Sequence, residues 1–171
     1  MNVAQRDGVV LRHATEADLP AIDTLTTVGY AEIQESFVAM LGPDLYETVQ
    51  ADPGQTWEQR KCAQNRRLFA EHPEQVWVLE DTDRVFAYVT FWLVPERGYG
   101  HLDNSAVDPT CRGEGWARFM YAHVLEHFRS LGLEYAHVDT GLDDAHIPAR
   151  AAYEAVGFDR SVPTVDLWRR L

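Results

Sequence analysis

Lysine is almost absent from this sequence, and positive charge is scarce overall. Lys61 is the single lysine among 171 residues, and acidic residues outnumber basic ones by 27 to 15, for a formal net charge of −12. A nucleic acid or an anionic membrane surface requires a basic face on its partner. We therefore expect neither as a partner. The scarcity of lysine itself says nothing about the substrate.

Cysteines and long hydrophobic runs are also lacking. Cys62 and Cys111 are the only cysteines, and their spacing matches neither a metal site nor a redox motif. The longest apolar run, from Val85 to Pro95, is too short to cross a bilayer and is interrupted by Thr90. The first residues lack the apolar core of a signal peptide. We expect a reduced, cytoplasmic protein, and the length predicts a single domain over residues 1–171.

Hydrophobic periodicity predicts alternating helices and strands. Strand patterns occupy residues 9–13, 76–80, 85–93, 98–107 and 135–140, and Gly157 and Phe158 with residues 164–169 suggest a closing pair. Helical spacing occurs over residues 19–28, 33–40, 56–71, 113–130 and 147–155. We therefore expect an α/β (α+β) fold, in which a mixed sheet carries helices on both faces.

The stretch from Arg112 to Ala117 is the most informative part of the sequence. It reads Arg-Gly-Glu-Gly-Trp-Ala, follows a strand pattern that ends at Val107, and opens an amphipathic helix. Glycines let the backbone approach an anion closely, and the first turn of a helix presents unpaired N–H groups at the positive end of its dipole. Arg112 and Arg118 add positive charge. The stretch predicts a phosphate-binding loop, although a tight strand-to-helix turn would use the same glycines.

Two segments together resemble the GCN5-related N-acetyltransferase (GNAT) superfamily. Residues 107–117 resemble its acyl-CoA pyrophosphate loop, and Tyr153 to Phe158 resembles its Tyr-x-x-x-Gly-Phe block. Both segments occur in the family's order and spacing, and the resemblance covers about residues 100–160. It implies a mostly antiparallel central sheet of about seven strands, with acetyl-CoA as the co-substrate.

The resemblance also assigns residues to acetyl-CoA. The strand that ends at Val107 is expected to offer backbone groups to the pantetheine arm, as an added strand would. Glu114 is a departure, because it places a negative charge in the phosphate loop. The residues expected to bind the co-substrate are Ser105, Ala106, Val107, Arg112, Gly113, Glu114, Gly115, Trp116, Ala117, Arg118 and His146.

Tyr153 matches the family's general-acid tyrosine. Acyl transfer from a thioester needs a proton for the departing thiolate. A phenol with a pKa of about 10 can supply it to a thiolate whose conjugate acid has a pKa of about 8.5. A tyrosine in a helix can equally serve to pack that helix against the sheet.

The base that would free the amine is less clearly marked. An amine with a pKa of about 10.4 is neutral in only about one part in two to three thousand at pH 7, so a proton acceptor is needed. Asp103, on the strand that precedes Val107, is the first candidate, and Asp139 near the end of the next strand is the second. An ordinary aspartate is too weak a base, so it would need burial or a mediating water.

The histidines raise two further questions. His146 precedes Tyr153 where the family commonly has an asparagine that hydrogen-bonds the cofactor, and it could make a similar bond, move protons or cap the helix. His123 and His127 lie one helical turn apart, but no glutamate completes a His-Glu-x-x-His motif. We expect these two to be a solvated pair and expect no metal.

The predicted reaction transfers an acetyl group from acetyl-CoA to a primary amine of a small molecule or peptide, by direct attack in a ternary complex. The alternative is a non-catalytic module that binds acyl-CoA as a sensor or for assembly. The resemblance places the acceptor pocket at Tyr30, Glu32, Glu35, Phe37 and Trp57, where aromatic rings among carboxylates would suit an amine. A homodimer is the assembly expected on general grounds.

Overall fold

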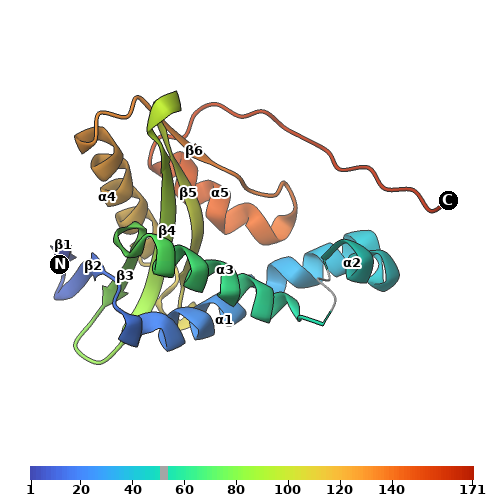
Figure 1. Cartoon of the computed structure of the whole chain (residues 1–171), viewed down its shortest axis with the longest axis horizontal. Helices are drawn as coiled ribbons and strands as arrows, with labels where there is room; N and C mark the ends of the chain where they lie inside the picture. Colours follow the sequence, from blue (N-terminus) through green and yellow to red (C-terminus); the bar gives the residue numbers. More distant parts are fainter. Residues whose placement is uncertain (51–53) are drawn as a thin grey trace.

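The computed structural model describes residues 1–50 and 54–171, and a six-stranded sheet forms its centre (Figure 1). The strands are β1 (Asn2–Arg6), β2 (Val9–His13), β3 (Val76–Glu80), β4 (Val85–Val94), β5 (Tyr99–Val107) and β6 (Tyr135–Val138). They lie side by side in chain order. Pairing is antiparallel from β1 to β5, whereas β6 runs parallel to β5. The expected mixed, mostly antiparallel sheet is confirmed.

Helices cover both faces of this sheet (Figure 1). They are α1 (Leu19–Leu41), α2 (Pro43–Gln50), α3 (Trp57–Glu71), α4 (Trp116–Ser130) and α5 (Ile147–Ala155). Side chains alternate between the two faces of a strand, so Trp77 and Leu79 of β3 pack in the core with α4 and α5, whereas Val76 and Val78 pack with α1 and α3. None of the helices in the described part of the chain combines the length and the apolar character that a bilayer crossing requires.

The number of strands differs from the prediction. The sheet has six strands rather than about seven, because Gly157, Phe158 and residues 164–169 form no strand. Val165 and Leu167 are exposed, and the extended tail runs from the sheet toward α2 (Figure 1), where Arg170 contacts Asp44. An alternating apolar pattern does not make a strand unless an edge pairs with it. Strand β1 was missed, because its sequence shows little apolar alternation.

One long helix replaces the two that were predicted between residues 19 and 40. Helix α1 continues through Gly29 without a break. A Cβ atom at Gly29 would lie 2.7 Å from the Cβ atom of Ala106, so this position requires a residue without a side chain. Helix α1 therefore lies directly against β5, the strand that leads into the glycine loop.

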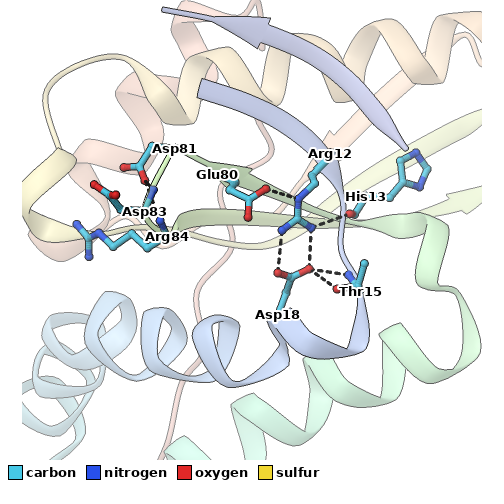
Figure 2. A network of polar contacts seen from close by, with 8 residues as sticks. All are labelled: Arg12, His13, Thr15, Asp18, Glu80, Asp81, Asp83 and Arg84. Carbon is cyan, nitrogen blue, oxygen red and sulfur yellow. Dashed lines mark hydrogen bonds and ion pairs between the residues drawn. The ribbon is translucent and has the colours of Figure 1, made fainter. Parts of the chain in front are cut away.

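Arg12 ties β2 to β3 and to the start of α1 (Figure 2). Its Nη1 and Nη2 atoms donate to the two carboxylate oxygens of Asp18 at 2.7 and 2.9 Å, and its Nε atom donates to Glu80 Oε2 at 2.7 Å. Asp18 Oδ2 also accepts hydrogen bonds from the backbone N–H and the hydroxyl of Thr15. The hydrogen bonds from Arg12 lower the pKa of Asp18. The network fixes where α1 begins against the sheet.

Candidate active site

A glycine loop carries the chain from β5 into α4. Gly113 and Gly115 have φ angles of +84° and +80°, a conformation that other residues rarely adopt. Gly115 is the N-cap residue of α4, so the unpaired N–H groups of the first helical turn follow it directly. Arg112 and Arg118 are exposed on either side of Gly115. The geometry is that of an anion-binding turn.

Asp108 shapes the start of this loop. Its Oδ1 atom accepts hydrogen bonds from the hydroxyl and the backbone N–H of Thr110 at 2.6 and 2.8 Å, and Arg84 forms an ion pair with it. These hydrogen bonds from Thr110, together with Arg84, lower the pKa of Asp108 to about 2. The loop therefore begins at a carboxylate that stays charged across the working pH range.

Strand β1 brings a further arginine to the loop, which sequence reasoning missed. Arg6 Nη2 donates to the carbonyl oxygen of Glu114 at 2.8 Å, and its guanidinium carbon lies 4.1 Å from the centroid of the Trp116 ring. A Cβ atom at Gly115 would lie 3.7 Å from both Arg6 Nη1 and Arg118 Nη2, so the two guanidinium groups flank this glycine. Beside them is a hollow of about 360 Å³, to which Arg129 also contributes.

The carboxylate of Glu114 is bound to its neighbour Trp116. Its Oε2 atom accepts a hydrogen bond from Trp116 Nε1 at 2.8 Å. Trp116 is buried and packs edge-on against Phe86, while Ala117 is half-buried beside it. The departure from the family pattern at Glu114 is thus accommodated by a contact with its neighbour.

Strand β5 extends beyond its partner β6. Its pairing with β6 ends at Leu102, opposite Val138, whereas its pairing with β4 continues to Val107. Thr90 of β4 stands opposite two residues of β5, Asp103 and Asn104, which makes a β-bulge. From this bulge onward, one edge of β5 has no neighbouring strand among the described residues. Ser105, Ala106 and Val107, expected to meet the pantetheine arm, follow the bulge.

Tyr153 meets a second tyrosine in the core beside this edge. Its ring stacks on that of Tyr121 with centroids 5.0 Å apart, and the Tyr121 hydroxyl lies 2.7 Å from Ser105 Oγ. Burial raises the pKa of Tyr153, and Tyr121 adds to the effect. The helical spacing over residues 113–130 does not distinguish Tyr121 from the other apolar residues on that face. The structure instead connects it to both Ser105 and Tyr153.

Asp103 lies at the bulge and is half-buried. Its Oδ2 atom accepts hydrogen bonds from Asn104 Nδ2 at 3.1 Å and from Thr90 Oγ1 at 3.3 Å. Asn104 Nδ2 also donates to Asn65 Oδ1 at 2.9 Å, which connects the bulge to α3. The carboxylate is held in place on the face of the sheet that α1 and α3 cover.

Asp139 follows β6 at the point where the two strands part. It is 81% exposed, and its oxygens lie 3.5 Å from His137 Nε2 and 4.0 Å from His101 Nε2. The Nδ1 atoms of His101 and His137 are 2.8 Å apart, and Trp92 stacks on His101. Within the described residues, this is the one cluster close enough to hold a metal ion. A single shared proton explains the short contact equally well, and we assign no metal to it.

His146 is tied to α1 through an aspartate. Its Nδ1 atom lies 2.5 Å from Asp143 Oδ1, while Asp143 Oδ2 accepts a hydrogen bond from Ser36 at 2.6 Å. His146 is the N-cap residue of α5, but its side chain makes no capping hydrogen bond. The ring of Phe37, an expected pocket residue, lies 6.1 Å from the His146 ring.

His123 and His127 do not form the expected solvated pair. Both are half-buried: His123 Nδ1 lies 2.8 Å from the carbonyl oxygen of Phe119, and the His127 ring packs against Trp77 and Phe91. Burial lowers the pKa of His127. The helix face that carries them is wider and more aromatic than its periodicity indicates.

Tyr30 is the expected pocket residue that reaches the bulge. Its hydroxyl accepts a hydrogen bond from the Ser105 N–H at 3.3 Å and donates to Asn104 Oδ1 at 3.2 Å. Lys61 Nζ lies 4.8 Å from the centroid of the Tyr30 ring. Glu32 and Glu35 are exposed on α1, and Trp57 is half-buried at the start of α3.

Comparison with known proteins gives a consistent result. The profile of the Acetyltransferase (GNAT) family matches residues 42–158. A mycothiol acetyltransferase of Thermobispora bispora is 33% identical over 157 residues, covering 75% of this chain and 52% of that protein. The chain spans about half the length of the curated relatives that it matches.

Solved structures share the fold at low sequence identity. The ribosomal-protein-S18-alanine N-acetyltransferase of Escherichia coli matches with a TM-score of 0.61 at 17% identity, over 90% of this chain and 79% of that one. N-acetylglutamate synthase from Neisseria gonorrhoeae, complexed with coenzyme A and N-acetyl-glutamate, matches with a TM-score of 0.51 at 17% identity, over 79% and 26% of the two chains.

Proposed function

Because the chain belongs to the acetyltransferase (GNAT) family, we propose that it transfers an acetyl group from acetyl-CoA to a primary amine. The amine belongs to a small molecule or peptide and attacks the thioester directly while both substrates are bound. The continuity between the glycine loop and the free edge of β5 carries this proposal. The loop suits a pyrophosphate, and the free edge suits the acyl-bearing arm of the same molecule.

The loop supplies the anion-binding half of the site. The N–H groups that follow Gly115 and the side chains of Arg112 and Arg118 would hold the phosphate oxygens, and Arg6 adds a third guanidinium group. Hydrogen bonds between charged partners are shorter and stronger than neutral ones. The coenzyme A bound to the N-acetylglutamate synthase of similar fold supports a CoA thioester as the donor.

The free edge supplies the other half. Ser105, Ala106 and Val107 would pair through their backbone with the pantetheine arm. The Ser105 N–H now donates to the Tyr30 hydroxyl. We propose that the thioester carbonyl replaces this hydroxyl as the acceptor, which would polarise the carbonyl for attack.

Tyr153 is the proposed general acid. Burial raises the pKa of Tyr153, so the phenol keeps its proton at neutral pH. The raised pKa also makes it a weaker donor than an exposed tyrosine, so the hydroxyl has to be aligned with the leaving sulfur. Stacking against Tyr121, which Ser105 holds by a hydrogen bond, would provide that alignment.

Asp103 is the proposed base, acting directly or through a water. It lies at the bulge two residues before Ser105, on the face of the sheet that Tyr30 and α3 cover. Asp139 with the two histidines at the parting of β5 and β6 is the second candidate. His146 is proposed as a cofactor contact, positioned by Asp143.

A non-catalytic acyl-CoA-binding module is the second candidate function. The hydrogen bond from the Ser105 N–H to Tyr30 favours it, because this bond closes the carbonyl site until Tyr30 moves. The two functions differ in turnover. Relatives named mycothiol acetyltransferase are about twice as long as this chain, so we propose the acceptor only as a primary amine.

The test measures thiol release from acetyl-CoA over a panel of small amines, amino acids, aminoglycosides and peptides, with thermal-shift binding in parallel. Turnover with any acceptor supports the enzyme. Stabilisation by acetyl-CoA and by CoA without turnover on the whole panel supports the binding module. Absence of both binding and turnover contradicts the role of the glycine loop.

A further inference from the structure

Lys61, the only lysine in the chain, lies beside the bulge of β5. It belongs to the first turns of α3, and its Nζ atom lies 4.8 Å from the centroid of the Tyr30 ring. The hydroxyl of the same tyrosine accepts the hydrogen bond from the Ser105 N–H at 3.3 Å. Tyr30 therefore connects a primary amine to the backbone group that we assign to the thioester carbonyl.

The Lys61 ammonium group has weak partners. Its one hydrogen bond within the described residues goes to Gln64 Oε1 at 3.3 Å, and no carboxylate there forms an ion pair with it. This is unusual in a chain with a net charge of −12. Asp103 is close enough to interact with Lys61 electrostatically. The Lys61 ammonium group is thus held over the Tyr30 ring near the bulge, with a long hydrogen bond to Gln64 and no carboxylate partner among the described residues.

We propose that Lys61 is an acetylation site of this protein, modified by the protein's own acetyl transfer when no external amine occupies the acceptor side. This inference rests on the proposed function, because it uses the same thioester and the same reaction centre. It adds a specific acceptor, the Nζ atom of Lys61, to the general class of primary amines. Transfer occurs within one chain, because the amine is half-buried beside its own β5.

The chemistry balances without any further reactant. Burial lowers the pKa of Lys61, while Asp103 opposes this shift, so a larger share of the amine is neutral than in an exposed lysine. The Nζ lone pair attacks the thioester carbonyl carbon, a C–N bond forms and the C–S bond breaks. The proton from nitrogen passes to Asp103 or water, and the thiolate takes a proton from Tyr153 to leave as free CoA.

The modification of Lys61 would be self-limiting. An acetylated lysine is neutral and cannot accept a second acetyl group in this reaction, so the modification stops at one acetyl group on Lys61. The added group would also occupy space beside Tyr30 that an external amine needs. An external amine that binds first should accordingly protect Lys61, and modification should be fastest when acetyl-CoA is present alone.

The test uses the full chain with acetyl-CoA and follows acetylation by peptide mass spectrometry. The matched reference is Arg67→Lys, which adds an exposed lysine on the same helix, at a position whose native side chain is 79% exposed. In this variant both lysines are exposed to the same acetyl-CoA in a single reaction. We expect Lys61 to be acetylated at least about tenfold faster, because its amine is held beside the thioester site whereas the reference lysine has to meet acetyl-CoA by diffusion.

A second measurement separates site-directed transfer from simple chemical reactivity. Excess free CoA should slow acetylation of Lys61 but leave the reference lysine unchanged, because only the former depends on the thioester site. The first-order rate at Lys61 should not change with protein concentration. In Lys61→Arg, which keeps the charge, the acetyl group on this peptide should vanish. Acetylation of the N-terminal amine is measured separately, on the peptide that contains it.

The outcomes keep this inference apart from the proposed function. If a panel amine is turned over but Lys61 is acetylated no faster than the reference lysine, the inference fails and the proposed function stands. If Lys61 is acetylated quickly and free CoA does not slow it, the reaction is chemical and the inference also fails. If neither thiol release nor acetylation of Lys61 occurs, both fail.

Discussion

The guanidinium group of Arg6 in β1 lies over the ring of Trp116 at the start of α4, with its guanidinium carbon 4.1 Å from the ring centroid. The same side chain donates a hydrogen bond to the carbonyl oxygen of Glu114. A cation over the face of an indole ring is attracted to it electrostatically. The first strand of the chain thus places a positive charge on the glycine loop.

Arg6→Gln should weaken acetyl-CoA binding. The variant removes one of the guanidinium groups that flank Gly115. Its KM for acetyl-CoA should rise by about threefold to tenfold, and kcat should change little, because the contact is made equally before and during the reaction. Steady-state kinetics check this. Arg67→Gln, at an exposed arginine on α3, is the control and should leave KM unchanged.

Arg112→Ala tests the loop from its other side. Arg112 is exposed and reaches back to the Val107 carbonyl oxygen at 3.4 Å, so it is free to turn toward a phosphate. Loss of a charge-assisted hydrogen bond of about 1.5 to 3 kcal/mol should raise the KM for acetyl-CoA by about tenfold. An unchanged KM would remove Arg112 from the binding site.

Tyr153→Phe should lower kcat while acetyl-CoA affinity stays nearly intact. The ring would still stack on Tyr121, so the packing between α4 and α5 survives, but the proton for the leaving thiolate is lost. Loss of a general acid costs about 10² to 10⁴ in rate. The matched variant Tyr121→Phe removes the hydrogen bond to Ser105 and should have the smaller effect. If affinity falls along with kcat, the Tyr153 hydroxyl binds substrate instead.

The glycine loop could be predicted from the sequence because its geometry is local. Gly113 and Gly115 adopt the positive φ angles that their spacing indicates, and the helix begins directly after them. The central strands β3 and β4 are short, nearly continuous apolar runs bounded by turn residues, so most of the sheet could also be predicted. These features depend on neighbours within a few residues of one another.

The parts that could not be predicted depend on contacts between distant segments. Arg6 reaches the loop from a strand that has little pattern of its own. Two helices were predicted over residues 19–28 and 33–40, but α1 is continuous across this interval, where Gly29 lies close to Ala106 of β5. Val165 and Leu167 alternate like a strand, yet they find no pairing edge. Lys61 acquires its position from Tyr30, which belongs to another helix.

Asp18→Asn should destabilise the chain by about 1 to 3 kcal/mol at pH 7, because the half-buried Arg12 loses its bidentate carboxylate partner and keeps only Glu80. Arg12 lowers the pKa of Asp18 in the folded state. The carboxylate therefore contributes stability above its unfolded pKa of about 3.9 and loses that contribution as pH falls through the lower folded pKa. Urea unfolding should show a difference in the free energy of unfolding between the native protein and Asp18→Asn, and this difference should narrow below about pH 4.

The control for this experiment is Asp83→Asn, an exposed carboxylate in the neighbouring turn (Figure 2). This change should leave the free energy of unfolding nearly the same at each pH. A gap between the native protein and Asp18→Asn that stays constant down to pH 2 would show that the loss comes from packing rather than from the charge of Asp18.

Asp103→Asn should change how activity depends on pH. The amide keeps the size of the carboxylate and can still accept a hydrogen bond from Thr90, but it cannot take a proton from the amine. If Asp103 is the base, kcat/KM of the native protein rises with pH as the carboxylate loses its proton, which gives the pH profile a rising limb. The variant should lose most of its activity, and its pH profile should lack this rising limb. Asp139→Asn, at an 81% exposed carboxylate, is the matched control and should keep the limb.

The reverse result, with the limb lost only in Asp139→Asn, would move the proton acceptor to the parting of β5 and β6, where His101 and His137 are in contact. A limb that persists in both variants would leave water as the acceptor, and the role of Asp103 would then be to hold the bulge through Asn104.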